Sequence, residues 1–230
     1  KTSGSITLDG VDLHKNPNAM HEVYLSSSDN WFPQGYKFKD LLAIYQGTYP
    51  EFDMEFAEDL IKVFDVNVKG KYSKASTGYK SIMKIILALA NPSEYIFLDE
   101  PVLGLDANHR QIFNKKLLEA YARRPRTFVI ATHLIEEVAS ILEKVIVIKD
   151  GVVTEEVLVE DVLHKGYVVS GASTLVEEYL ADKKVLETDR IGNLTRSVVI
   201  GAIGEAQPGL EFSPLTLQDY FISITRKENE

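Results

Sequence analysis

Two adjacent carboxylates close a short apolar run at residues 95–101, which read Tyr-Ile-Phe-Leu-Asp-Glu-Pro. A short continuous apolar run suits a strand that is buried on both faces. In α/β proteins, ligands bind beyond the carboxyl ends of the strands. At such an end, Asp99 is suited to hold a hydrated Mg²⁺ on a nucleotide, and Glu100 is suited to orient or deprotonate an attacking water. The alternative is a strand that runs into an ordinary acidic turn.

Three other segments carry polar groups that suit the same chemistry. Residues 103–106 read Leu-Gly-Leu-Asp, and Thr132-His133 close the next apolar run. Residues 75–79 (Ala-Ser-Thr-Gly-Tyr) open an amphipathic segment, where free backbone N–H groups and the Ser76 hydroxyl favour an anion. Taken alone, Ser76 reads as an ordinary N-cap and His133 as a buried histidine at a strand end.

The elements that must position these residues follow from apolar patterning. Continuous apolar runs at residues 95–98, 127–131 and 145–148 predict buried strands, with helical patterns near 108–123 and 135–142 between them. Alternating strands and helices predict a parallel sheet with crossover helices, in which the three runs are neighbouring strands.

The remaining segments complete the predicted organisation. Apolar residues recur at helical spacing in three segments between residues 38 and 90, which predicts a mostly helical block. Shorter signals predict strands near 23–25, 167–169 and 196–200, a helix over 175–180, a tight turn at Asp9-Gly10, and a closing helix capped by Thr216 and Asp219. Asp150-Gly151 predicts a turn that joins the run 145–148 to residues 152–157 as a hairpin.

Composition narrows the functional class. The chain has 230 residues, no cysteine and a formal charge of −9, which excludes a disulfide framework and disfavours a nucleic-acid binder. No apolar run approaches the roughly 20 residues that span a bilayer. We therefore expect a soluble, intracellular chain that would serve a membrane only by binding a partner.

Taken together, the motifs resemble those of ABC-type ATPases. Residues 75–79 resemble the signature motif, usually Leu-Ser-Gly-Gly-Gln, and residues 95–100 resemble the Walker B strand with its catalytic glutamate. Residues 103–106 resemble the D-loop, and His133 falls where the family keeps its switch histidine. The order and spacing of all four agree, and the resemblance covers about residues 3–160.

The resemblance implies ATP and Mg²⁺ as cofactors. It makes Asp99 the Mg²⁺ support, through water, and Glu100 the general base for the water that attacks the γ-phosphate. It makes His133 the residue that contacts this phosphate.

The resemblance also implies a paired ATPase subunit, because the family works as a head-to-tail dimer. Ser76 and Gly78 would reach the ATP held by the second subunit, and Asp106 would lie at the dimer interface.

The chain also departs from the family pattern. No phosphate loop of the form Gly-x-x-x-x-Gly-Lys-Ser/Thr occurs in it, and Lys1-Thr2 reads as the end of a linker that follows a missing Walker A part. Alignment on residues 31–33 puts Ser27 where the family has its glutamine. The signature is altered at Thr77 and Tyr79, and apolar residues at 82 and 87 replace arginines often found there.

We therefore expect an α/β, P-loop NTPase-like fold. An ABC ATPase domain would cover residues 1–160, with its helical subdomain near 38–90, and a small α+β domain would cover residues 161–230. The resemblance implies a subunit that hydrolyses ATP to power a separate transmembrane permease, peripheral on the inner face of the cell membrane and without nucleic acid. This chain alone would be inactive for lack of Walker A.

Two alternatives to a transporter subunit remain. One is a degenerate cassette that acts as a regulatory or binding partner. The other is a non-transport ABC protein, which is disfavoured by the acidic balance and by the single cassette. In the transporter reading, the permease would bind the helical block and the loop 26–32, where Trp31 and Phe32 either anchor the permease or pack under the block.

Overall fold

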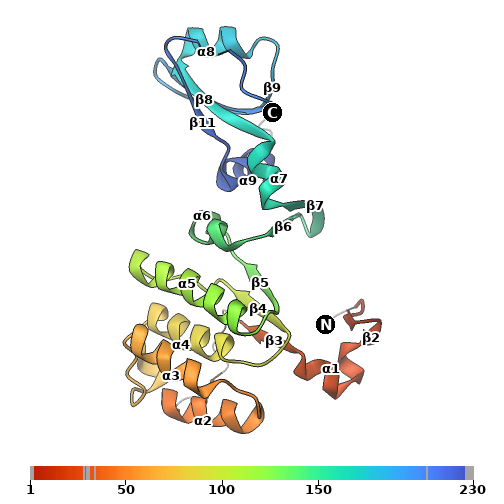
Figure 1. The fold of residues 1–230 in the computed structure, drawn as a ribbon, viewed down its shortest axis with the longest axis vertical. Coiled ribbons are helices and arrows are strands. Elements are labelled where there is room, and N and C mark those ends of the chain that lie inside the picture. The colour runs from red at the N-terminus through yellow and green to blue at the C-terminus, as the bar shows by residue number, and fades with distance from the viewer. Residues whose placement is uncertain (1–2, 28, 30–31, 34, 206, 226–230) are drawn as a thin grey trace. The chain divides into compact units, whose positions relative to one another are not determined.

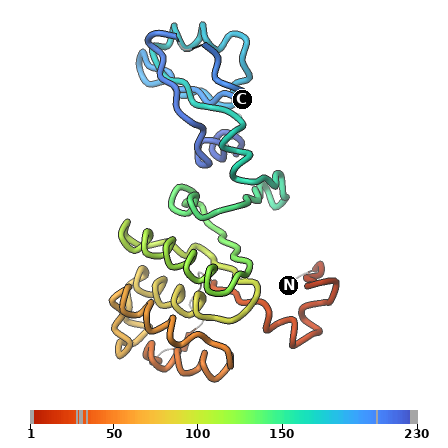
Figure 2. The backbone as a smooth tube through the Cα atoms, viewed as in Figure 1, coloured from red at the N-terminus to blue at the C-terminus, as the bar shows by residue number. Residues whose placement is uncertain are grey.

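The computed structural model describes residues 3–225 except 28, 30, 31, 34 and 206. Lys1-Thr2 and Trp31 therefore lie outside the described residues. The chain divides into two compact units, Lys1–Glu137 and Val138–Glu230, and each is described by itself. Figures 1 and 2 show the elements and the path of the chain.

The first unit contains a three-stranded parallel sheet of order β3-β4-β5. Its strands are β3 (Val23–Ser26), β4 (Tyr95–Asp99) and β5 (Thr127–Ala131). The prediction that residues 95–99 and 127–131 are adjacent parallel strands is confirmed, with Asp99 opposite Ala131.

One face of this sheet is partly exposed among the described residues of the first unit, contrary to the expectation that residues 95–98 are buried on both faces. Ile96 and Leu98 are buried, whereas the alternate residue Phe97 is 37% exposed. Its register partners on the neighbouring strands, Leu25 and Val129, are also exposed. The helices thus cover only the face that carries Ile96 and Leu98.

The three helices predicted from the spacing of apolar residues are confirmed. The helical block consists of α2 (Phe38–Thr48), α3 (Met54–Val63) and α4 (Thr77–Leu89), with a 3-10 turn η2 (Tyr72–Lys74) before α4. The side of α4 that carries Ile82, Ile85 and Ile86 is buried. Figure 1 shows α4 beside α5 (Ala107–Arg123), the crossover between β4 and β5.

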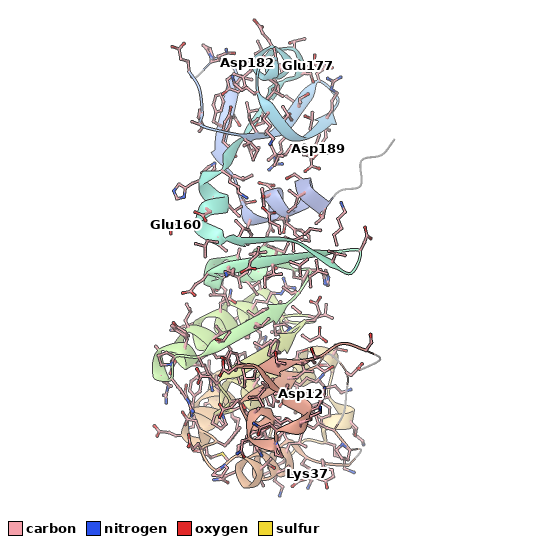
Figure 3. All side chains as sticks on the ribbon, turned by 90° about the vertical axis from the view of Figure 1, so that its right-hand side faces the viewer. Asp12, Lys37, Glu160, Glu177, Asp182 and Asp189 are labelled. Atoms are coloured by element: carbon pink, nitrogen blue, oxygen red, sulfur yellow. The ribbon has the colours of Figure 1, made fainter. Side chains whose placement is uncertain are left out.

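The start of the chain forms a small hairpin. β1 (Thr7–Leu8) and β2 (Val11–Asp12) pair antiparallel around Asp9 and Gly10, which both have positive φ, as the predicted tight turn requires. Asp12, labelled in Figure 3, caps the 3-10 turn η1 (Leu13–Lys15), and α1 (Pro17–His21) follows.

The prediction that residues 145–148 form the third parallel strand is wrong. β6 (Lys144–Lys149) pairs antiparallel with β7 (Val152–Leu158) in a two-stranded sheet of the second unit. The turn between them is the predicted one, since Asp150 (φ 51°) and Gly151 (φ 78°) both adopt the left-handed conformation that a two-residue hairpin loop needs. The third strand of the parallel sheet is β3 instead. The predicted helix over 135–142 is also shorter, as α6 (Ile135–Val138) and the 3-10 turn η3 (Ala139–Ile141).

The rest of the second unit is an antiparallel sheet of order β11-β8-β10-β9 with helices around it. Its elements are α7 (Val159–His164), β8 (Gly166–Ala172), α8 (Ser173–Leu180), β9 (Lys184–Ile191), β10 (Leu194–Ile200), β11 (Leu210–Pro214) and α9 (Leu217–Thr225). The core is centred on Tyr167, Val176 and Tyr179. The predicted cap is present, because Asp219 N donates to Thr216 Oγ1 at 3.1 Å. The strands near 167–169 and 196–200 and the helix over 175–180 are confirmed.

Candidate functional site

Glu100 leaves the end of β4 in a strained backbone conformation. Its φ is 48°, a left-handed value that is uncommon for residues other than glycine. Its amide still continues the sheet, donating to the Ala131 carbonyl at 2.8 Å. Strain of this kind persists where the surroundings fix it, which here is the edge of the neighbouring strand.

The Glu100 carboxylate is held by the residues that follow β5. Its Oε2 accepts from Thr132 Oγ1 at 2.7 Å. Its Oε1 lies 3.2 Å from the donating backbone N of His133 and 2.8 Å from His133 Nδ1. The side chain of Glu100 is 22% exposed and that of His133 is 67% exposed. The reading of His133 as a buried histidine is therefore excluded.

The hydrogen bonds decide the protonation of Glu100. Partial burial raises the pKa of its carboxyl, but the hydrogen bonds from His133 and Thr132 outweigh burial and leave the pKa below its usual value. At neutral pH this group is an ionised acceptor.

Lys84 of α4 interacts both with the backbone of Ser27 and with the charge of Asp99. Lys84 Nζ donates to the carbonyls of Ser27 and Asp29, at 2.8 Å each. Burial lowers the pKa of Lys84, although the nearby charges of Asp29 and Asp99 oppose this shift. Lys84 therefore links the segment after β3 to the carboxylate at the end of β4.

A second group of predicted residues lines a pocket of about 300 Å³ between α4 and the segment before α5. Ser76, Gly78 and Asp106 all contribute to its wall, and Glu100 and His133 do not. Ser76 is the N-cap of α4, because its Oγ accepts from Tyr79 N at 3.2 Å. Asp106 caps α5 in the same way, accepting from His109 N at 2.9 Å.

The backbone of Gly78 lies very close to the backbone of Gly104 at this pocket. A Cβ atom at Gly78 would lie 2.3 Å from the carbonyl oxygen of Gly104, a contact that side chains do not make. Ser81 Oγ also donates to the Leu103 carbonyl at 3.1 Å, on the same side of α4. The first turns of α4 and the segment 103–106 are therefore packed backbone to backbone.

Comparison with known proteins gives a consistent set of relatives, although no protein-family model matches the chain. The ABC transporter ATP-binding protein YtrB of Bacillus subtilis (strain 168) is 27% identical over 187 residues, which is 81% of this chain and 60% of YtrB. The spermidine/putrescine import ATP-binding protein PotA of Thermotoga maritima is 26% identical over 236 residues, which is 98% of this chain and 64% of PotA. The chain thus spans about 60% of the length of these relatives.

Solved structures agree with these relatives. An ATP-binding subunit of an ABC transporter superposes with a TM-score of 0.62 at 17% identity, covering 70% of this chain and 69% of its own. A protein described as a cobalt transport ATP-binding protein superposes with a TM-score of 0.59 at 19% identity, covering 88% of this chain and 72% of its own. The fold is that of an ABC ATPase domain. The predicted fold class is confirmed.

Within this ABC ATPase fold, the predicted residues form two groups. Glu100 and His133 meet directly at the sheet edge where Asp99 ends β4. Ser76, Gly78 and Asp106 line the pocket at the start of α4.

Sequence reasoning assigned no role to Lys84 or Thr132. A lysine inside the apolar run Ile82–Leu89 was the available signal for Lys84, because a cation there needs acceptors.

The structure also shows where the side chain of Phe32 packs. Its ring packs edge-on against Tyr72, with centroids 4.9 Å apart, and tilted against Tyr45 at 6.5 Å. Phe32 therefore packs under the helical block, the second of the two roles considered for it.

Proposed function

We propose that this chain is an ATP-binding and ATP-hydrolysing subunit that powers a separate membrane permease of an ABC transporter. The observation that carries the proposal is the cluster of Glu100, Thr132 and His133 beside Asp99, at the carboxyl ends of two parallel strands. The ABC ATPase fold and the ATP-binding relatives support the nucleotide-binding part.

Glu100 is the proposed base. A carboxylate has about four acceptor positions, and Thr132 and His133 occupy three of those on Glu100. One position is left for a water molecule, in a direction set by the other three. Because its pKa is low, Glu100 acts first by orienting this water and accepts its proton only as bond formation makes the water acidic.

The residues fit Mg²⁺ and ATP as cofactors. Mg²⁺ keeps several waters and binds through one or two carboxylates together with substrate phosphates. Asp99 offers one such carboxylate, and the described residues contain no cluster of three or more His, Cys, Asp or Glu suited to a metal. We propose that Asp99 holds Mg²⁺ through water. When bound, ATP with Mg²⁺ would supply the phosphoryl group, and we propose that His133 would contact that group while it holds Glu100.

The pocket at α4 is the proposed contact with a second ATPase subunit. Ser76 and Gly78 stand at the N-terminal end of a helix, which favours an anion. We propose that they reach ATP on the paired subunit and that Asp106 lies at the interface. Residues 1–160 would form this ATPase domain and residues 161–230 an appended domain.

The permease is proposed to bind the helical block. Ile44 of α2 and Val63 of α3 are exposed there, and the ring of Phe32 packs against Tyr72 of the same block. Among the helices that the structure describes, none has the length and apolar character to cross a membrane. Membrane association at the inner face would then come from the permease.

A degenerate cassette without hydrolysis is the second candidate. Tyr79, in place of the signature glutamine, lines the pocket at α4, but its hydroxyl is engaged by Asn67 N within the helical block. The hydroxyl of Ser76 is also engaged as an N-cap. These contacts favour a binding or regulatory partner.

Nucleotide binding tests the proposal at Asp99. The printed 230 residues contain no phosphate loop and should by themselves bind ATP weakly and hydrolyse none, so the test uses these residues joined behind a phosphate-binding loop. Asp99→Asn should weaken ATP binding in Mg²⁺ and leave binding in EDTA unchanged. Asp182→Asn, on an exposed residue labelled in Figure 3, is the matched control. Equal ATP affinity of Asp99→Asn and the control in Mg²⁺ would remove Asp99 from the metal site.

A further inference from the structure

A second pocket lies in the first unit, at the end of the sheet where β5 begins. It has a volume of about 220 Å³ and is bounded by the last residues of α4 and α5 and by the loop before α3. Three arginines line it: Arg123, Arg124 and Arg126. Glu100 and His133 follow the opposite ends of β4 and β5, so this pocket is separate from the candidate ATPase site.

Arg126 is the buried member of the three, with 8% of its surface exposed. Its Nη2 donates to the Leu89 carbonyl at 2.7 Å and its Nη1 donates to the Asn91 carbonyl, so its side chain ties the end of α4 to β5. Burial lowers the pKa of Arg126 to about 10, which still leaves it charged at neutral pH. Both of these acceptors are neutral carbonyls, and the charges of Glu94 and Asp53 favour the charged form of Arg126.

Two buried donors in this pocket have no partner among the described residues: Arg126 Nε and Asn91 Nδ2. Asn91 is fully buried, and its Oδ1 already accepts from Ser93 N at 2.9 Å, which fixes the amide so that only its NH₂ group is left over. Both groups without a partner are hydrogen-bond donors, so a molecule that pairs with them must offer a hydrogen-bond acceptor. Buried donors of this kind are normally satisfied by water or by a ligand.

The other two arginines line the pocket with acidic partners. Arg124 Nη1 lies 3.0 Å from Glu51 Oε2, and Arg123 Nη1 lies 3.6 Å from Asp53 Oδ2. Arg123 Nε also lies 3.4 Å from Glu119 Oε1, and the charges of Glu94 and Asp53 act on Arg126, so acidic side chains accompany all three guanidinium groups.

We propose that this pocket binds a small oxyanion, a phosphate or carboxylate group, which accepts from Arg126 Nε and Asn91 Nδ2 and faces the guanidinium groups of Arg123 and Arg124. Arginine suits this role because its planar donors match the geometry of both groups. The ligand would also bridge the end of α4 to the start of β5, so its binding should stabilise the first unit.

Thermal unfolding of the 230-residue chain in phosphate, acetate or chloride at equal ionic strength tests this site. A ligand that binds only the folded state raises the midpoint in a saturable way. We expect saturation with phosphate or acetate and none with chloride. The oxyanion that saturates at the lower concentration identifies whether the natural group is a phosphate or a carboxylate.

Asn91→Asp is the diagnostic variant. It keeps the Oδ1 acceptor for Ser93 N but replaces the unused NH₂ donor with a carboxylate that can neutralise Arg126 itself. We expect a higher midpoint in chloride and at least a tenfold weaker response to the oxyanion. Asn193→Asp, at an exposed position of the second unit, is the control and should respond as the wild type does.

Arg124→Gln provides a second variant at the side of the pocket, where no buried contact is lost. It should weaken oxyanion binding several-fold, whereas Arg190→Gln, which breaks a surface ion pair with Glu177, should not. The absence of any saturable response in the wild type would overturn the proposal. So would an unchanged response in both Asn91→Asp and Arg124→Gln.

Discussion

The Nδ1 atom of His133 lies 2.8 Å from Oε1 of Glu100, although 33 residues separate them in the chain. The contact exists because β4 and β5 are parallel neighbours, so the residues after Asp99 and Ala131 emerge at the same edge. Thr132 adds a third hydrogen bond to the same carboxylate. A carboxylate held in this way has a fixed direction and a fixed charge, which are the two properties that the proposed water activation requires.

Removing the Thr132 hydroxyl should raise the pKa of Glu100. Thr132→Val deletes the bond to Oε2, one of the contacts that lower this pKa. A carboxyl with a lowered folded pKa contributes stability above its unfolded pKa, and this contribution is lost as the pH falls through the folded value. The wild type should therefore lose stability as the pH falls below the ordinary pKa of a glutamate, about 4.3, and Thr132→Val should lose less over the same range.

Unfolding free energies measured between pH 7 and pH 3 check this expectation. Thr132→Ser, which keeps the hydroxyl, is the matched control. A Thr132→Val curve parallel to that of the wild type would mean that this hydrogen bond does not set the charge of Glu100.

Adding a methyl group at Gly78 should separate α4 from the segment before α5. The new Cβ would meet the Gly104 carbonyl oxygen at 2.3 Å, and both sides of the contact are backbone. We expect Gly78→Ala to destabilise the chain by about 1–3 kcal/mol, as overpacking does.

Gly47→Ala is the control for this substitution. Gly47 lies near the end of α2 and would place its Cβ in open space, so the change should be neutral or slightly stabilising. Chemical denaturation of both variants makes the comparison. If Gly78→Ala were as stable as Gly47→Ala, the backbone contact with Gly104 would be absent in solution.

Lys84 should hold the segment that contains Ser27. Lys84→Met keeps the apolar stem and removes both hydrogen bonds to the carbonyls of Ser27 and Asp29. We expect a loss of about 1 kcal/mol in the free energy of unfolding and faster amide hydrogen exchange near residues 27–29. Lys80→Met, on the same helix, is the comparison. Unchanged exchange at residues 27–29 in Lys84→Met would contradict the assigned role.

Local patterns were enough to predict most elements of this chain. The spacing of Ile82, Ile85 and Ile86 predicted α4, and Asp150-Gly151 predicted the β6–β7 turn, because each depends on neighbours in sequence. The same turn predicted the hairpin of β6 with the strand that follows it, which is confirmed. Its placement in the parallel sheet was wrong, because an apolar run does not show which sheet its strand joins.

The site was predicted as a set of residues but not as a geometry. The spacing of the motifs placed Asp99, Glu100 and His133 at one edge, because parallel strands bring their carboxyl ends together. The positive φ of Glu100 and the approach of Gly78 to Gly104 depend on contacts between distant segments. Neither has a signature in the local sequence.

ATP turnover by Glu100→Gln is the most direct test of the proposed mechanism, in a chain that carries these residues behind a phosphate-binding loop. The amide keeps the shape of the carboxylate and removes its basicity. Turnover should fall by roughly 10²–10⁴-fold, with ATP affinity retained and an ATP-dependent dimer accumulating on size exclusion. Glu205→Gln, an exposed carboxylate of the second unit, should leave turnover unchanged. Turnover of Glu100→Gln equal to that of this control, or loss of its ATP binding, would contradict the assignment of Glu100 as the base.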